Sequence, residues 1–181
     1  MTQDNDSITQ KVKNMYKKYP YPSPSIDLAQ TNELLNLLRI FELESNTKLD
    51  NLSILDAGCG SGHRITNVAE FFTTCSFLGI DISDKSLEIA NGLKSTKKLQ
   101  NIRFQNSNIM DGVGELGKFD LVLCMGVLHH LSNPDKGLKM LVKTLRVNGM
   151  IFLYLYGKLG GHKRMLNKEA ISILLGNEKH N

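Results

Sequence analysis

The sequence lacks any hydrophobic run long enough to cross a membrane. Its longest apolar run is Met150–Tyr156, far shorter than the roughly 20 residues that a membrane-spanning helix needs. The N-terminal stretch MTQDNDSITQ is polar and has no apolar core of the kind found in signal peptides. We therefore expect a cytoplasmic protein with no membrane partner.

Cysteine is scarce, and neither sign of charge dominates. Cys59, Cys75 and Cys124 follow neither the spacing of metal ligands nor that of a disulfide framework, so we expect no metal site and a reducing compartment. The net charge of +4 is too small to indicate nucleic acid by itself. With 41% hydrophobic and 22% charged residues, the composition is typical of a globular chain.

The N-terminal residues 1–50 predict two helices that precede the main domain. Apolar side chains recur at helical spacing over residues 7–19, and a second amphipathic pattern covers residues 27–44. Between them, the prolines of YPYPSPS remove backbone donors and end the first helix. We expect this segment to form a helical lid over the domain that follows.

Strand and helix patterns alternate over residues 51–157. Short apolar runs predict five strands, and the segments between them carry helix starts and amphipathic faces. This alternation is typical of a doubly wound, mostly parallel α/β sheet. The expected strands are 52–56, 76–80, 102–105, 119–125 and 150–156, and the expected helices are 61–72, 83–93 and 134–146.

A glycine-rich turn follows the first expected strand. In ILDAGCGSGHR, residues 54–64, Gly58, Gly60 and Gly62 alternate with small residues. Glycine allows the backbone to approach a ligand closely, and the helix start behind it presents free N–H groups. Because ligands of such sheets bind at the carboxyl ends of the strands, we expect the binding site here.

Two acidic residues discriminate between possible ligands of this turn. Asp56 precedes the turn, where it would repel a pyrophosphate and attract an ammonium group. His63 also occupies the position of the last glycine in a dinucleotide-binding pattern. Asp81 ends the second expected strand, where a carboxylate can accept both hydroxyls of a ribose. A ligand that carries both an amino acid part and a ribose is S-adenosylmethionine.

On these residues the sequence resembles the class I S-adenosylmethionine-dependent methyltransferases. ILDAGCGSG resembles the first motif of that family, FLGIDIS the second, and IRFQNSNIMD the third-strand motif. The stretch FDLVLCMGVLHHLSNPDKGLKMLVKTLRVNGMIFLYLYG resembles the segment of that family from the fourth strand through the fifth. The combination of LHHL with an upstream YPYP is similar to the pattern of a bacterial subgroup of this family. The resemblance covers about residues 52–157 and implies a Rossmann-like fold and methyl transfer to an acceptor.

The resemblance also implies three groups of cofactor contacts. The methionine part would lie against Gly58, Cys59, Gly60 and Met125, with Asp56 near its ammonium group. The ribose hydroxyls would bind Asp81. The adenine would lie against Ile82, Asn108 and Ile109. Asn108 stands where many family members have an acid, but its carbonyl oxygen can still accept a hydrogen bond from the adenine amino group.

Structural interpretations of the same residues remain open. The glycine stretch can be a tight turn without a ligand, Asp81 can cap the next helix, and Asn108 can be a turn residue. His130 is a candidate base toward an acceptor oxygen or nitrogen, or it only holds its loop. Tyr16, Tyr19 or Tyr21 of the lid can touch the cofactor, while the lysines between them leave contact with nucleic acid as a less favoured alternative.

The C-terminal residues 158–181 carry one weak helical pattern, about 168–175. Related folds usually add a sixth strand and an antiparallel seventh, and no such patterns occur here. We therefore expect a fragment, or a domain without that C-terminal hairpin. The fifth strand would then have an exposed edge, which predicts self-association.

The function left open by the sequence is the acceptor. A small molecule is favoured, and protein and RNA are alternatives. A sulfonium already makes its methyl group electrophilic, so a dedicated catalytic residue is not required. Two other classes of function remain: a cofactor-binding module without its own activity, and a nicotinamide-dependent dehydrogenase.

Overall fold

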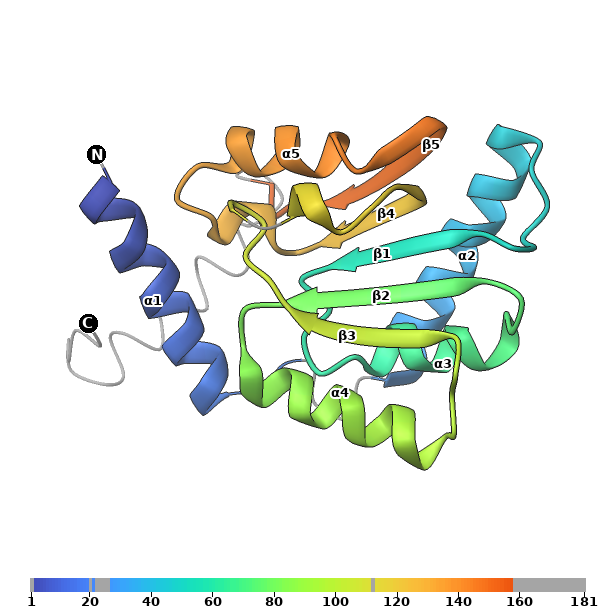
Figure 1. Cartoon of the computed structure of the whole chain (residues 1–181), viewed down its shortest axis with the longest axis horizontal. Coiled ribbons are helices and arrows are strands. Elements are labelled where there is room, and N and C mark those ends of the chain that lie inside the picture. The colour runs from blue at the N-terminus through green and yellow to red at the C-terminus, as the bar shows by residue number, and fades with distance from the viewer. Residues whose placement is uncertain (1, 20, 22–26, 112, 158–181) are drawn as a thin grey trace.

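The computed structural model describes residues 2–19, 21, 27–111 and 113–157. This part of the chain forms a five-stranded sheet with helices on both faces (Figure 1). All strand pairs are parallel, and their order is β3-β2-β1-β4-β5. The predicted doubly wound sheet is confirmed. The chain order reverses between β1 and β4, which is where such folds bind ligands.

The helices and strands follow the predicted order. The strands are β1 (Ser53–Ala57), β2 (Ser76–Asp81), β3 (Ile102–Asn106), β4 (Phe119–Met125) and β5 (Leu145–Tyr154). The helices are α1 (Thr2–Lys18), α2 (Asp27–Ser45), α3 (His63–Phe71), α4 (Asp84–Thr96) and α5 (Pro134–Val142), with short 3-10 turns at Val113–Glu115 (η2) and Leu128–His130 (η3). The predicted helix 168–175 lies outside the described residues.

The sheet separates two hydrophobic layers. On one face, Leu34 and Leu38 of α2 and Val68 of α3 pack against Ile54 and its neighbours. On the other face, Leu55 packs with side chains of β4, η3 and α5. Because neighbouring residues of a strand point to opposite faces, a central strand covered on both sides is mostly apolar. This explains the continuous hydrophobic runs that predicted β1 and β4.

The boundary between α5 and β5 differs from the prediction. The helix ends at Val142 and not at residue 146, and the strand begins at Leu145 and not at residue 150. Asn148, at a positive φ of 64°, and Gly149 lie inside the strand, where its register against β4 shifts. The Asn-Gly pair therefore forms an irregularity within β5 and does not join a helix to a strand.

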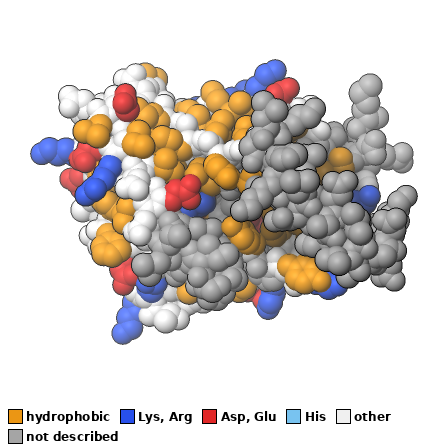
Figure 2. Space-filling model, turned by 180° about the vertical axis from the view of Figure 1, so that it is seen from behind, with side chains coloured by type: hydrophobic (Ala, Val, Ile, Leu, Met, Phe, Trp, Pro, Cys, Tyr) orange, Lys and Arg blue, Asp and Glu red, His pale blue; other side chains and the backbone are white. Residues whose placement is uncertain are grey.

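β5 forms one edge of the sheet within the described residues, beside β4. Val147 is 93% exposed, and the large side chains at the end of the strand are also exposed. Figure 2 shows hydrophobic side chains interspersed with charged ones on the face opposite to the view of Figure 1. Self-association through this edge remains a prediction. None of the described helices is long and apolar enough to cross a membrane.

Gly62 allows α3 to start close to α4. It has a φ of +73°, and a Cβ atom there would lie 2.7 Å from the Cβ of Ala90 and 3.0 Å from the ring of Phe104. Side chains rarely adopt this backbone conformation, and the neighbouring atoms leave no room for one. The glycine therefore fixes the position of the first turn of α3, which borders the expected ligand site.

We predict that Gly62→Ala lowers the free energy of unfolding by about 2 kcal/mol or more, from backbone strain and overpacking. Gly92→Ala is the matched control, since Gly92 lies within α4 and a Cβ there meets nothing within 4 Å. That substitution should raise the free energy by about 0.5–1 kcal/mol. Urea unfolding of both variants measures the difference, and equal effects would contradict the packing argument.

Candidate functional site

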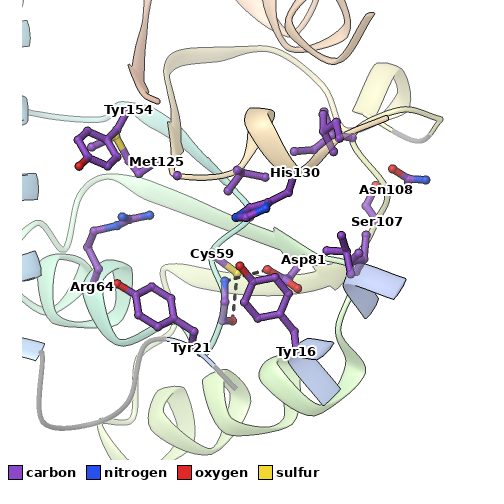
Figure 3. A pocket seen from close by; sticks show the side chains of 18 of the residues that line it. Tyr16, Tyr21, Cys59, Arg64, Asp81, Ser107, Asn108, Met125, His130 and Tyr154 are labelled. Carbon is purple, nitrogen blue, oxygen red and sulfur yellow. Dashed lines mark hydrogen bonds between the residues drawn. The ribbon is translucent and has the colours of Figure 1, made fainter. Parts of the chain in front are cut away.

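A cavity of ≈ 440 Å³ opens at the carboxyl ends of the strands around the β1/β4 reversal (Figure 3). Most of the predicted cofactor residues line it, together with the candidate base His130. These lining residues are Gly58, Cys59, Gly60, Asp81, Ile82, Asn108, Ile109 and Met125. The exception is Asp56, which does not line the cavity. The topology thus gathers residues that lie far apart in the sequence.

The glycine turn is tied to the end of β2 by backbone hydrogen bonds. The N–H groups of Gly58 and Cys59 both donate to the carbonyl oxygen of Ile80, at 2.8 and 2.9 Å. Gly58 has a φ of +81°, and a Cβ there would meet the side chain of Val127 at 2.3 Å. Burial raises the pKa of the Cys59 thiol well above its ordinary value, so the thiol stays neutral. The turn is therefore a fixed, uncharged floor of the cavity.

Asp81 joins this turn to the start of α4. One carboxylate oxygen accepts from Gly60 N at 2.9 Å, and the other accepts from Ser83 N at 2.9 Å. Burial raises the pKa of the Asp81 carboxyl, while these N–H donors act in the opposite direction. A carboxylate has about four lone-pair positions, so the bonds to Gly60 and Ser83 use only part of its acceptor capacity. Asp81 thus serves the helix start and also lines the cavity.

Asp56 is completely buried beneath the cavity and is paired with Arg64. Its Oδ1 accepts from Nη2 of Arg64 at 2.7 Å, and the two side chains are 0% and 11% exposed. Oδ2 of Asp56 and Nε of Arg64 are buried without a hydrogen-bond partner. Burial tends to lower the pKa of Arg64, but Asp56 outweighs it and the net shift is upward. A guanidinium therefore lines the cavity where the sequence suggested a carboxylate.

Sequence reasoning did not identify Arg64. A usable signal was present, because an arginine in the first turn of α3 directly follows the glycine turn. The periodicity of α3 showed only that this position is not part of the apolar stripe. The pairing depends on the approach of α3 to the end of β1, which is a property of the fold and not of local spacing.

The N-terminal segment contributes a further wall. Thr9, Val12 and Tyr16 of α1 line the cavity, and Lys13 pairs with Asp84 at 3.2 Å. Burial and the charge of Asp81 raise the pKa of the Tyr16 hydroxyl. Of the other two predicted tyrosines, Tyr21 lines the cavity, and Tyr19 is 63% exposed and does not.

The two histidines that follow β4 pack against aromatic rings from other segments. The ring centre of His129 lies 4.2 Å from that of His130 and 4.3 Å from that of Tyr156. His130 also meets Tyr16 edge-on at 6.4 Å. Burial lowers the pKa of His130 below its ordinary value of 6.5. A neutral imidazole at neutral pH can accept a proton.

Asn108 lies at the far end of the cavity from Arg64 (Figure 3). Its side-chain oxygen accepts from Met110 N at 3.0 Å, and its Nδ2 donates to Asp111 at 2.9 Å. These local bonds agree with the turn interpretation. One lone pair of the oxygen remains for a ligand. Asp81 lies between the two ends, so amide, carboxylate and guanidinium groups succeed one another along the cavity.

The comparisons with known proteins match this geometry. A family described as a methyltransferase domain matches residues 48–170. The chain belongs to the class I S-adenosylmethionine-dependent methyltransferase family. PKMT2 from Rickettsia typhi, solved in complex with AdoHcy, is similar to this methyltransferase domain at a TM-score of 0.63 and 31% sequence identity. The match covers 71% of this chain and 25% of that one.

Two curated relatives extend the comparison of this methyltransferase domain. An uncharacterized protein of Synechococcus sp. is 30% identical over 96% of this chain and 43% of its own length. A tRNA U34 carboxymethyltransferase of Campylobacter jejuni is 32% identical over 65% of this chain and 38% of its own length. The chain thus spans less than half of either relative. The predicted family and Rossmann-like fold are confirmed, and the dehydrogenase alternative is not favoured.

We predict that Arg64→Met lowers the free energy of unfolding by about 3–5 kcal/mol, because it leaves Asp56 buried and unpaired. Adding Asp56→Asn should recover much of this loss. The matched control, Lys85→Met, breaks an exposed pair with Glu88 and should cost about 0–1 kcal/mol. A double-mutant cycle in urea measures the coupling, and additive effects of the two substitutions would rule out the ion pair.

Proposed function

We propose that this domain binds S-adenosylmethionine in the cavity and transfers its methyl group to an acceptor. The observation that carries the proposal is the order of polar groups along the cavity, Asn108, then Asp81, then Arg64. The cofactor has the same order of parts: adenine, ribose and a zwitterionic amino acid. Family membership supports this match.

The adenine and ribose ends follow the sequence-based expectation. Asp81 keeps acceptor capacity for the ribose hydroxyls, and Ile82 and Ile109 supply apolar surface for the adenine ring. The remaining lone pair of the Asn108 oxygen accepts from the adenine amino group. Gly58, Cys59, Gly60 and Met125 line the methionine part.

The amino acid end requires a revised assignment. Arg64 presents its guanidinium to the cavity and binds the cofactor carboxylate, for which its planar donors are suited. Asp56 acts through Arg64, which it holds and orients from below. Glu33 of α2 also lines the cavity and lies near enough to Arg64 to raise the pKa of that residue. We assign the ammonium group to Glu33.

The chain's residues position the reactants and exclude water. When bound, the cofactor supplies an electrophilic methyl group. The acceptor atom would form a bond to the methyl carbon as the carbon–sulfur bond breaks, with the electron pair left on sulfur. The acceptor releases one proton, and His130 is the candidate that takes it up. Tyr16 and the rest of α1 act as a lid, consistent with their place in the cavity wall.

The alternative is a cofactor-binding module without activity of its own. The names of the relatives refer to their own acceptors and do not define the acceptor here. Binding of cofactor without methyl transfer to any cell extract would distinguish the module from the enzyme.

We predict that isothermal titration of the full chain detects binding of S-adenosylhomocysteine. Asp81→Asn should weaken this binding by about tenfold to a hundredfold, because it removes charged hydrogen-bond acceptors from the ribose. Asp135→Asn is the matched control, since Asp135 is exposed and lies in the first turn of α5, outside the cavity. Absence of heat with the wild-type chain would refute the proposed function.

We predict that His130 titrates below pH 6.5, because its burial disfavours the imidazolium form. The group is then uncharged and able to accept a proton at pH 7. The measurement is the pH dependence of the imidazole NMR signal, which His130→Gln identifies by its loss. A midpoint at or above 6.5 would remove the support for His130 as the base.

A further inference from the structure

Five aromatic rings form a continuous row, and four of them, all except His129, line the cavity. Tyr154 meets Tyr156 edge-on with ring centres 5.7 Å apart, and Tyr156 lies 4.3 Å from His129. His129 lies 4.2 Å from His130, which meets Tyr16 at 6.4 Å. The row runs from the end of β5 through η3 to α1, three segments that are distant in sequence.

The row begins beside Met125, which lines the proposed position of the methionine part of the cofactor. Tyr154 pairs with Met125 across the β4–β5 ladder, and Gly126 N donates to the Tyr154 carbonyl oxygen at 2.8 Å. Figure 3 shows the Tyr154 ring next to Met125. Tyr154 and Tyr156 are 47% and 44% exposed, so a second molecule can reach their rings from solvent. An acceptor that enters from this side therefore meets these rings.

The chemistry of this side of the cavity is apolar and uncharged. The described lining residues of β4, η3 and β5 include no lysine, arginine, aspartate or glutamate. The carboxylates of the cavity, Asp81 and Glu33, belong to β2 and α2. A charged acceptor would lose hydration here without gaining an ion partner on this side. The wall therefore favours an uncharged acceptor group.

The arrangement of the rings distinguishes between two kinds of aromatic binding site, one for a cation and one for another ring. A cation is bound by rings that face a common empty centre. Here each ring contacts the next, so the rings form a wall whose exposed parts suit offset or edge-on packing of another ring. We infer that the acceptor presents an uncharged planar aromatic ring to the row from Tyr154 to His130, and that a hydroxyl or ring nitrogen of that ring receives the methyl group. This inference rests on the proposed function.

The step balances with groups already named. The acceptor O–H or N–H proton would pass to a nitrogen of the neutral His130 and then to water. The acceptor atom would bond to the methyl carbon as the methyl carbon–sulfur bond breaks, and the electron pair of that bond would stay on sulfur. Two sources supply such a ring: a free hydroxylated aromatic compound, or an unstacked nucleobase of RNA. The ring is the shared chemistry, and the experiment distinguishes the sources.

The test uses the full chain saturated with S-adenosylhomocysteine, whose binding is measured first. The probes are 2-naphthol and its saturated counterpart decahydro-2-naphthol, which has the same carbon skeleton and hydroxyl group without aromatic rings. Titration calorimetry should show 2-naphthol binding about tenfold more tightly, because only that probe gains ring packing. If S-adenosylhomocysteine binds and the two naphthol probes bind equally or not at all, this inference fails and the proposed function stands.

Matched variants locate the probe. Tyr156→Leu keeps a bulky apolar side chain and should abolish the preference for 2-naphthol. Tyr19→Leu, at an exposed tyrosine outside the cavity, should keep it. Retention of the preference in Tyr156→Leu would overturn the inference. Tetramethylammonium binding that is lost in Tyr156→Leu would also overturn it, by showing a cation site.

A competition experiment identifies the source of the ring. A single-stranded oligouridine that displaces 2-naphthol from the cofactor-saturated chain would support a nucleobase acceptor. Retention of 2-naphthol in its presence, together with the aromatic preference, would support a free aromatic compound. Because the first titration reports cofactor binding alone, failure of the proposed function is seen separately from failure of this inference.

Discussion

The whole site depends on the carboxylate of Asp81. Its two oxygens accept from Gly60 of the glycine turn and from Ser83 at the start of α4. These bonds hold the end of β1 against the end of β2 and fix the floor of the cavity. Because the bonds use only part of the acceptor capacity of the carboxylate, the group that builds the site also has lone pairs left for a ribose. The structural role of Asp81 and its proposed ribose-binding role are therefore compatible, because they use different lone pairs of one carboxylate.

The positive charge of Arg64 at the other end of the cavity is explained by the burial of Asp56. A lone carboxylate beneath the turn would carry a large desolvation cost, and Arg64 offsets it at 2.7 Å. The guanidinium is long enough to reach from α3 to Asp56 and still line the cavity. The cavity consequently presents a cation where a carboxylate had been expected, and it is suited to the acidic half of an amino acid. Asp56 itself does not line the cavity and is paired with that cation.

Most of the fold and part of the candidate site could be predicted from the sequence. The strands were predictable because both faces are covered, and Asp81 and the glycines were predictable because strand ends converge at the reversal point. The α5–β5 boundary was not, since Asn148-Gly149 has the same local preference in a loop and in a strand irregularity. Arg64 and the ring row were also missed, because they depend on contacts between segments distant in sequence. The helix pattern of α1 identified Tyr16 but not that Tyr19 points away from the cavity.

Tyr16 links the two halves of the site. Burial and the charge of Asp81, at the proposed ribose position, raise the pKa of its hydroxyl. Its ring meets that of His130 in the aromatic row. The Lys13–Asp84 pair joins the same helix to the start of α4. Under the proposed assignment, α1 therefore covers the cofactor and completes the acceptor wall with one side chain. The two proposed binding sites then share a boundary formed by α1, so cofactor binding and acceptor positioning would depend on the same helix.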